Sequence, residues 1–125
     1  MRNAIRRLPD AELTVMQAVW ACSHPVTSHT LEKQLSPEHP MALTTLLTLL
    51  SRLVEKEFLT VEKLGRSNGY TPTVTQQEYL AAQGRRFVDQ LCGGSVSVFA
   101  SALCDSGLTK EELAQLRKLL EEGGL

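Results

Sequence analysis

Hydroxyl side chains gather on one face of a predicted helix that spans residues 42–57. Leucines fill the opposite face, which predicts that this side packs against a core. Hydroxyls donate and accept hydrogen bonds, and a guanidinium binds guanine edges and phosphates, so the polar face has the chemistry to read DNA base edges. The polar face consists of Thr44, Thr45, Thr48, Ser51 and Arg52, and the packing face of Leu43, Leu46, Leu50, Leu53 and Val54. The plain alternative, an ordinary solvent-facing side, stays open for this helix taken alone.

A second polar group follows at the tip of a predicted hairpin. Strand-like alternation over residues 58–64 is followed by a turn over residues 65–69 and a short return strand over residues 70–74. Gly65 and Gly69 would supply the backbone freedom that a tight turn needs. The polar residues at or beside the tip, where a hairpin could contact a sugar-phosphate backbone, are Lys63, Arg66, Ser67 and Asn68. A hairpin tip with ordinary polar residues is the alternative.

The order of the predicted helices and strands indicates that the polar helix face and the polar hairpin tip belong to one fold. Helices predicted from about Asp10 to Trp20, over residues 28–35 and over residues 42–57 precede the hairpin, which is the order of a winged helix-turn-helix. Three further helices are predicted after residue 75, separated by the Gly93-Gly94 pair and a turn at residues 105–107. The predicted class is mainly α with a small β-hairpin wing: a head over residues 1–74 and a helical tail over residues 75–125.

No constellation for catalysis, a cofactor or a metal is visible. The three cysteines lack the spacing of a metal or redox motif, so each is interpreted as a small buried hydrophobe. The three histidines, interpreted as solvated surface residues, show no ligand spacing, and no Ser/His/Asp or Cys/His arrangement is present. The prediction is a non-enzyme without catalytic residues, cofactor or metal. The residues concerned are Cys22, Cys92, Cys104, His24, His29 and His39.

Composition sets limits on the class of protein. The chain has 125 residues, 42% of them hydrophobic and 22% charged, with a net charge of −1. The head has 8 Lys and Arg against 7 Asp and Glu, and the tail has 5 against 7, so DNA binding would depend on a few placed cations. No apolar run approaches the roughly 18 residues that cross a bilayer, and the basic start has no apolar stretch of a secretory signal. We expect a cytoplasmic protein without membrane insertion.

Several segments resemble the penicillinase and methicillin-resistance repressor family, and the resemblance covers about Leu8 to Glu122. They include the A-E-x-x-V-M-x-x-V-W pattern from Ala11 to Trp20 and the G-R-x-x-x-Y-x-P pattern from Gly65. The segments are LPDAELTVMQAVW, VTSHTLEKQL, TTLLTLLSRLVEKEFL, EKLGRSNGYTPTVTQQEYLAAQ and FVDQLCGG.

The resemblance implies a homodimeric winged-helix transcriptional repressor that binds double-stranded operator DNA as an inverted repeat. It implies that the third helix enters the major groove and that the hairpin contacts the backbone. Resistance-related members often carry basic residues at the positions of Thr44 and Leu47, so the operator here should differ from theirs. The DNA-binding residues that it implies are Thr44, Thr45, Leu47, Thr48 and Arg52 on the helix, with Lys63 and Arg66 on the wing.

The resemblance also suggests how the repressor could be switched off. The best-known members are cleaved between Asn and Phe in the helix after the double glycine, and Ala102-Leu103 is the corresponding bond here. A membrane sensor-protease system is therefore a candidate partner, but the altered pair means that the protease differs or that cleavage is not the signal. Copper-responsive relatives have clustered cysteines, and the separated Cys92 and Cys104 do not fit copper sensing.

The tail is predicted to hold two copies together. About fifty residues struggle to bury a core of their own, and a symmetric interface with a second copy would hide its apolar side chains. Folding back onto the head is the alternative. The predicted interface residues are Phe87, Leu91, Val98, Phe99, Leu113, Leu116 and Leu120.

One alternative function comes from a different class. Winged helices also serve as scaffolds that bind other proteins, and a nearly neutral head would suit such an interaction module. The two functions differ in salt-dependent, sequence-specific retention of DNA, which a scaffold would lack.

Overall fold

The computed structural model describes residues 5–122 and divides the chain into two compact units between Gln83 and Gly84. The division falls inside helix α4 (Gln76–Leu91), whose first turns belong to the first unit. The head boundary predicted after residue 74 remains a prediction about domains, since compactness alone does not define where a domain functions. Each unit is described by itself below.

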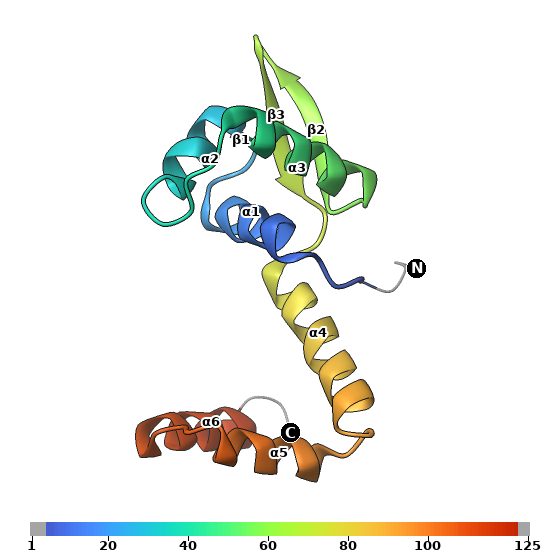
Figure 1. Ribbon diagram of the computed structural model, residues 1–125, viewed down its shortest axis with the longest axis vertical. Coiled ribbons are helices and arrows are strands. Elements are labelled where there is room, and N and C mark those ends of the chain that lie inside the picture. The colour runs from blue at the N-terminus through green and yellow to red at the C-terminus, as the bar shows by residue number, and fades with distance from the viewer. Residues whose placement is uncertain (1–4, 123–125) are drawn as a thin grey trace. The chain divides into compact units, whose positions relative to one another are not determined.

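Besides the first turns of α4, the first unit contains three complete helices and a three-stranded sheet (Figure 1), which confirms the predicted class of a helical head with a hairpin wing. The hairpin of strands β2 and β3 extends beyond the helices (Figure 1). The elements are α1 (Asp10–Ala21), β1 (Val26–Thr27), α2 (Ser28–Leu35), α3 (Leu43–Glu55), β2 (Leu59–Leu64) and β3 (Ser67–Pro72).

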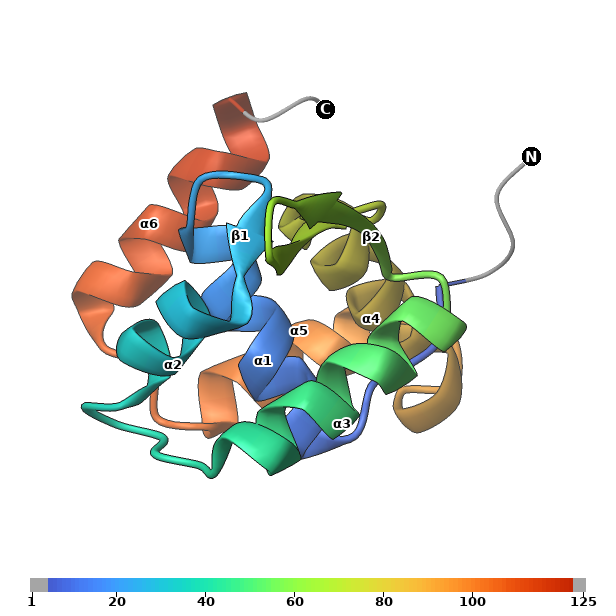
Figure 2. The same ribbon diagram turned by 90° about the horizontal axis from the view of Figure 1, so that it is seen from above.

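Helices α2 and α3 begin differently. Thr27 caps α2, because its side-chain oxygen accepts a hydrogen bond from the backbone N–H of Thr30 at 3.3 Å. Helix α3 begins after Ala42, which offers no side-chain cap, so its first N–H groups are left for water or a ligand. The connection from Ser36 to Ala42, seen from above in Figure 2, contains Pro37 and Pro40, which cannot continue a helix.

The core of this unit lies between the three helices and one face of the sheet. From α3 it receives four buried leucines, Leu46, Leu49, Leu50 and Leu53. The predicted packing face was therefore wrong at two positions. Leu43 was assigned to it but is exposed, and Leu49 was left out of it but is buried. Leu43 is the first residue of the helix, so its side chain lies at the end of the packed region. The partners in α1 and α2 include Val15, Met16, Val19, Leu31 and Leu35.

The sheet has the order β1-β3-β2 and is antiparallel throughout. Strand β1, which pairs Val26 with Tyr70, was not predicted, because two residues give no detectable alternation. The hairpin turn is also shorter than predicted: β2 ends at Leu64 and β3 already begins at Ser67. Ser67 and Asn68 are therefore strand residues, and the turn consists of residues 65 and 66 alone.

The two hairpin glycines have different physical roles. Gly65 lies in the turn with a φ of 63°, a conformation that favours glycine, as predicted. Gly69 was predicted to supply backbone freedom too, but no positive φ is found there. A Cβ on Gly69 would lie 2.4 Å from Cδ1 of Leu64, so a side chain at this position would require the exposed Leu64 side chain to move.

Tyr79 attaches the first turns of α4 to the head. Its hydroxyl oxygen accepts a hydrogen bond from the buried backbone N–H of Leu8 at 2.9 Å. Its ring lies 5.7 Å from that of Trp20 and 6.0 Å from that of Phe58. Trp20 in turn donates its indole N–H to the carbonyl of Val74 at 2.8 Å. This aromatic cluster explains why the compact unit extends past the hairpin.

We expect Tyr79→Phe to lower the free energy of unfolding by about 1–3 kcal/mol, because the buried N–H of Leu8 loses its acceptor. Urea denaturation of the variant and the parent chain measures the change. Tyr70→Phe is the matched control, since within residues 5–122 the Tyr70 hydroxyl makes no hydrogen bond. Equal stability of the two variants would mean that water satisfies the Leu8 N–H and would contradict the assigned role.

The second unit holds the end of α4 together with α5 (Val96–Asp105) and α6 (Lys110–Glu122). Helix α5 is capped by Ser95, and α6 has the predicted capping box, in which Thr109 and Glu112 bond each other's backbone N–H groups. No buried side chain lies on α5 or α6.

The exposure of the cysteines and histidines was predicted with different success. Cys92 is buried as predicted, but Cys22 is only half-buried and Cys104 is exposed, so the interpretation of every cysteine as a buried hydrophobe was wrong. Cys104 lies on a helix that buries nothing within its own unit, which explains the difference. The three histidines are exposed, as predicted.

Among the described residues, no single helix is long and apolar enough to cross a membrane, and only the bent pair α4 and α5 reaches the required length and composition together.

Candidate nucleic-acid interface

The exposed face of α3 carries all the residues proposed there as DNA readers. Each of them is exposed, whereas the leucines between them are buried in the core. The helix thus holds the reader face rigidly, because four leucine anchors fix its rotation about its own axis. The exposed residues are Thr44, Thr45, Leu47, Thr48, Ser51 and Arg52.

Thr48 has a hydrogen bond within the helix. Its hydroxyl donates to the backbone carbonyl of Thr44 at 3.0 Å, a common arrangement for threonine in a helix. While that bond is kept, the hydroxyl offers a ligand only its acceptor capacity. The sequence pattern could not reveal this, because it treats every hydroxyl as both a donor and an acceptor.

The hairpin carries two exposed cations near its tip. Arg66 lies in the turn, and Lys63 stands opposite Asn68 in the strand register. Within residues 5–122, neither Lys63, Arg66 nor Arg52 forms an ion pair. All three cations therefore remain available to a polyanion, which is the property that contacts to phosphate require.

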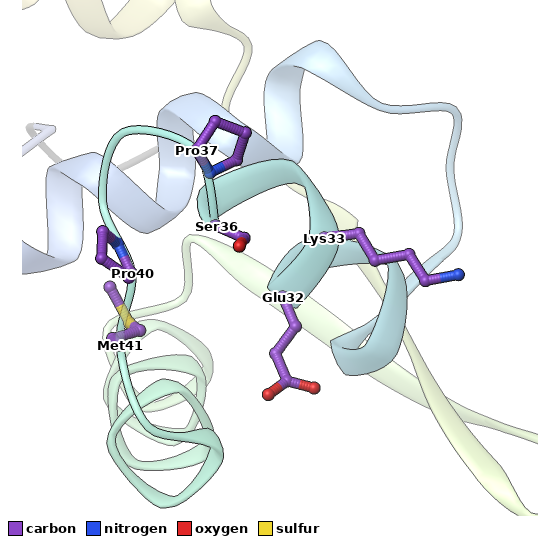
Figure 3. A pocket seen from close by; sticks show the side chains of 6 residues that line it. All are labelled: Glu32, Lys33, Ser36, Pro37, Pro40 and Met41. Atoms are coloured by element: carbon purple, nitrogen blue, oxygen red, sulfur yellow. The ribbon is translucent and has the colours of Figure 1, made fainter.

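A hollow of about 430 Å³ lies beside the connection between α2 and α3 (Figure 3). It is lined by two charged residues, Glu32 and Lys33, and by residues of the proline-containing turn. Lys33 extends away from Pro40 and Met41 (Figure 3). Such a shallow, mixed surface offers no convergent polar groups that would orient a small substrate.

Groups of three or more His, Cys, Asp or Glu residues placed to hold a metal ion do not occur in the described part of the chain. Its buried side-chain nitrogen and oxygen atoms also all have hydrogen-bond partners. The chemistry with the strongest structural basis is therefore that of the exposed α3 face and the wing.

Comparison with known proteins gives the family. The sequence profile described as "Penicillinase repressor" matches residues 8–122. The chain belongs to the penicillinase repressor family. A penicillinase repressor of Bacillus licheniformis is 32% identical over 119 residues, which is 94% of this chain and 92% of the relative. The BlaI transcriptional regulator of Mycobacterium tuberculosis is 31% identical over 77 residues, 62% of this chain and 56% of the relative.

Solved structures of the family resemble this chain. The solution structure of the DNA binding domain of the repressor BlaI is 33% identical, with a TM-score of 0.53, and the match covers 63% of this chain and 94% of that one. The Bacillus licheniformis BlaI monomeric form in complex with the blaP half-operator is also 33% identical, with a TM-score of 0.51 and the same coverage. The predicted family and the winged-helix fold are thus confirmed.

In this penicillinase repressor family member, the second unit exposes most of the proposed interface residues. Leu91 is 73% exposed, and five of the seven residues are exposed in all. The other two, Phe99 and Leu116, are half-buried, and the Phe99 ring packs edge-on against Phe87 with centroids 5.5 Å apart. The sequence pattern did not single out Leu119, although its side chain on α6 is 67% exposed. The exposed five are Phe87, Leu91, Val98, Leu113 and Leu120.

The bond proposed for cleavage lies inside α5 of this family member. Ala102 is exposed and Leu103 is half-buried. Proteases bind extended chains, so this segment would have to unwind before cleavage. Since α5 buries no side chain within the unit, such unwinding would disrupt little packing there.

Proposed function

We propose that this chain is a sequence-specific DNA-binding transcriptional repressor that acts as a homodimer on an inverted-repeat operator. The observation that carries the proposal is the exposed, polar face of α3 on a head that is 33% identical to a BlaI form solved with the blaP half-operator. Helix α3 would lie in the major groove, and the wing would lie along the sugar-phosphate backbone.

The side chains divide into two roles. Thr44, Thr45, Leu47 and Thr48 would contact base edges, because they lie on the first two turns of the helix. Arg52 would bind a phosphate or a guanine edge from the last turn. Lys63 and Arg66 would bind phosphates and hold the register of the head on the duplex.

The second unit supports a homodimer. Helices α5 and α6 bury no side chain among the described residues, and they expose large apolar side chains such as Val96, Leu119 and Leu120. A stable unit needs these apolar faces covered, and a second copy offers a self-complementary surface. Dimerisation would place two α3 helices about one DNA turn apart, roughly 34 Å, and so match an inverted repeat.

Relief of repression would act on this dimer. Cleavage of Ala102-Leu103 by a sensor-protease would separate α6 from the head and remove three of the seven proposed interface residues, Leu113, Leu116 and Leu120. Another signal that loosens α5 would have the same consequence. In either case DNA affinity would fall without any change in α3. The cytoplasmic location stays a prediction from the sequence.

Titration of the full chain onto the DNA upstream of its own gene, at several salt concentrations, tests the proposal. A repressor should bind that DNA more tightly than an unrelated duplex, and its affinity for the DNA should fall steeply as the salt concentration rises. The protein-interaction module would give weak retention that does not depend on sequence. That second result would contradict the proposal.

Two substitutions separate backbone contacts from base contacts. We expect Arg66→Ala to weaken binding to every duplex and to reduce the slope of log affinity against log salt by about 1, because one phosphate contact is lost. We expect Thr48→Ala instead to change the preference at particular base pairs. Competition between operator variants in a gel-shift titration measures both effects.

Arg85→Ala is the control for the first of these variants. Arg85 lies on α4 and forms an exposed ion pair with Asp89 at 2.6 Å, an arrangement that contributes little to stability. Like Arg66→Ala, the substitution Arg85→Ala removes one positive charge, but Arg85 does not belong to the wing. A uniform loss from both Arg66→Ala and Thr48→Ala would show that the two roles were wrongly assigned.

A further inference from the structure

Helix α3 exposes two leucines on the face that is proposed to enter the major groove. Leu43 is 44% exposed and Leu47 is 40% exposed. They are four residues apart, so they lie one above the other on the same side of the helix. Neither belongs to the core, which is filled by the other leucines of this helix. The reader face therefore has an apolar strip at its beginning.

The polar groups beside this strip offer single hydroxyl donors, whereas a guanine edge takes a pair of donors. Thr48 donates its hydroxyl hydrogen to the carbonyl of Thr44, and while that bond is kept its oxygen acts only as an acceptor toward DNA. The cation of this face, Arg52, lies more than one turn after Leu47. A guanine edge, which presents two acceptors, would find no bidentate donor opposite Leu47.

An exposed leucine that becomes buried against DNA needs an apolar group to contact. A leucine placed against a base edge that has only hydrogen-bond donors and acceptors removes water from these polar groups. They are then left unpaired, which is unfavourable. The 5-methyl group of thymine is the apolar group that the major groove offers. We propose that Leu47, with Leu43 beside it, reads the 5-methyl group of a thymine in each operator half-site. This inference rests on the proposed function, because it requires α3 in the major groove.

Deoxyuridine substitution tests this inference, because deoxyuridine differs from thymidine only by the missing methyl group. The site is first obtained by selecting duplexes from a random pool with the full chain. Each thymine of that site is then replaced in turn. We expect one position in each half-site at which the replacement weakens binding by about fourfold, the effect of one buried methyl group. A 5-methylcytosine-guanine pair there should bind more tightly than the unmethylated pair.

The Leu47→Ala variant should lose that position-specific penalty while other positions keep theirs. Gln17→Ala, an exposed substitution on α1, is the control and should keep the full penalty. Circular dichroism melting of both variants confirms that each is folded; since Leu47 is outside the core, its melting temperature should stay close to that of the parent.

The two failures are distinguishable. A selected, tightly bound site with no methyl dependence, or with a dependence that Leu47→Ala retains, would overturn the reading of thymine and leave the repressor proposal intact. Absence of any selected site would overturn the proposed function and this inference with it.

Discussion

We expect Leu91→Lys to convert the proposed dimer to a monomer and to weaken binding to an inverted-repeat operator by about 100-fold or more. The side chain is 73% exposed at the end of α4, so a lysine there should leave the fold of one copy unchanged. In a symmetric dimer the same substitution places two charges in an apolar interface. A dimer binds its second half-site at a high effective concentration, and the monomer loses this advantage, which is worth about 10²–10⁴ in affinity.

Two measurements check this result together. Sedimentation gives the mass of the variant, and titration against a full operator and a half-operator gives both affinities. Only the affinity for the full operator should fall. Gln90→Lys is the matched control, because it adds the same charge at the neighbouring exposed position. A Leu91→Lys chain that stays dimeric would refute the assigned interface. A monomer with full operator affinity would show that dimerisation does not matter for binding.

Lys56→Ala lowers the free energy of unfolding by about 3 kcal/mol, because it leaves a buried carboxylate without its partner. Glu12 on α1 is 3% exposed, and its carboxylate oxygen Oε1 lies 2.5 Å from Nζ of Lys56. The Lys56 side chain is 23% exposed, so water reaches the lysine end of the pair, and the loss should lie at the lower end for buried pairs. Guanidinium unfolding at neutral pH measures it.

Two controls distinguish this explanation from a general loss of packing. Replacement of both partners, Glu12→Leu with Lys56→Met, should cost far less than Lys56→Ala, because no charge is then left buried. Arg85→Ala breaks an exposed pair and should change stability by less than about 0.5 kcal/mol. If the double variant is as unstable as Lys56→Ala, the ion pair is not the cause.

The pair of Glu12 and Lys56 also shows where prediction from the sequence ends. The periodicity of the third helix predicted its extent to within two residues at each end, and the Thr109–Glu112 capping box predicted the start of α6. Both are local signals, carried by neighbours along the chain. No local signal links a glutamate in α1 to a lysine 44 residues later, because that contact depends on how α1 and α3 pack.

The same limit applies to Leu43 and Tyr79. A helical wheel assigns Leu43 to the packing face, but it cannot show that the packed region begins only about one turn later, at Leu46. The hydroxyl of Tyr79 meets Leu8 across 71 residues, so nothing in the hairpin sequence reveals that the head continues into α4. Residues that depend on distant contacts need the structure, whereas helical spacing alone predicted the exposed polar face of α3, and the resemblance added Leu47 to the proposed readers.

Selection of bound duplexes from a random pool by the full chain tests the central claim most directly. A dimeric, sequence-specific repressor should enrich one sequence, arranged as an inverted repeat whose half-sites lie about one helical turn apart. Recovery of a pool without a shared sequence would contradict the claim of a dimeric, sequence-specific repressor.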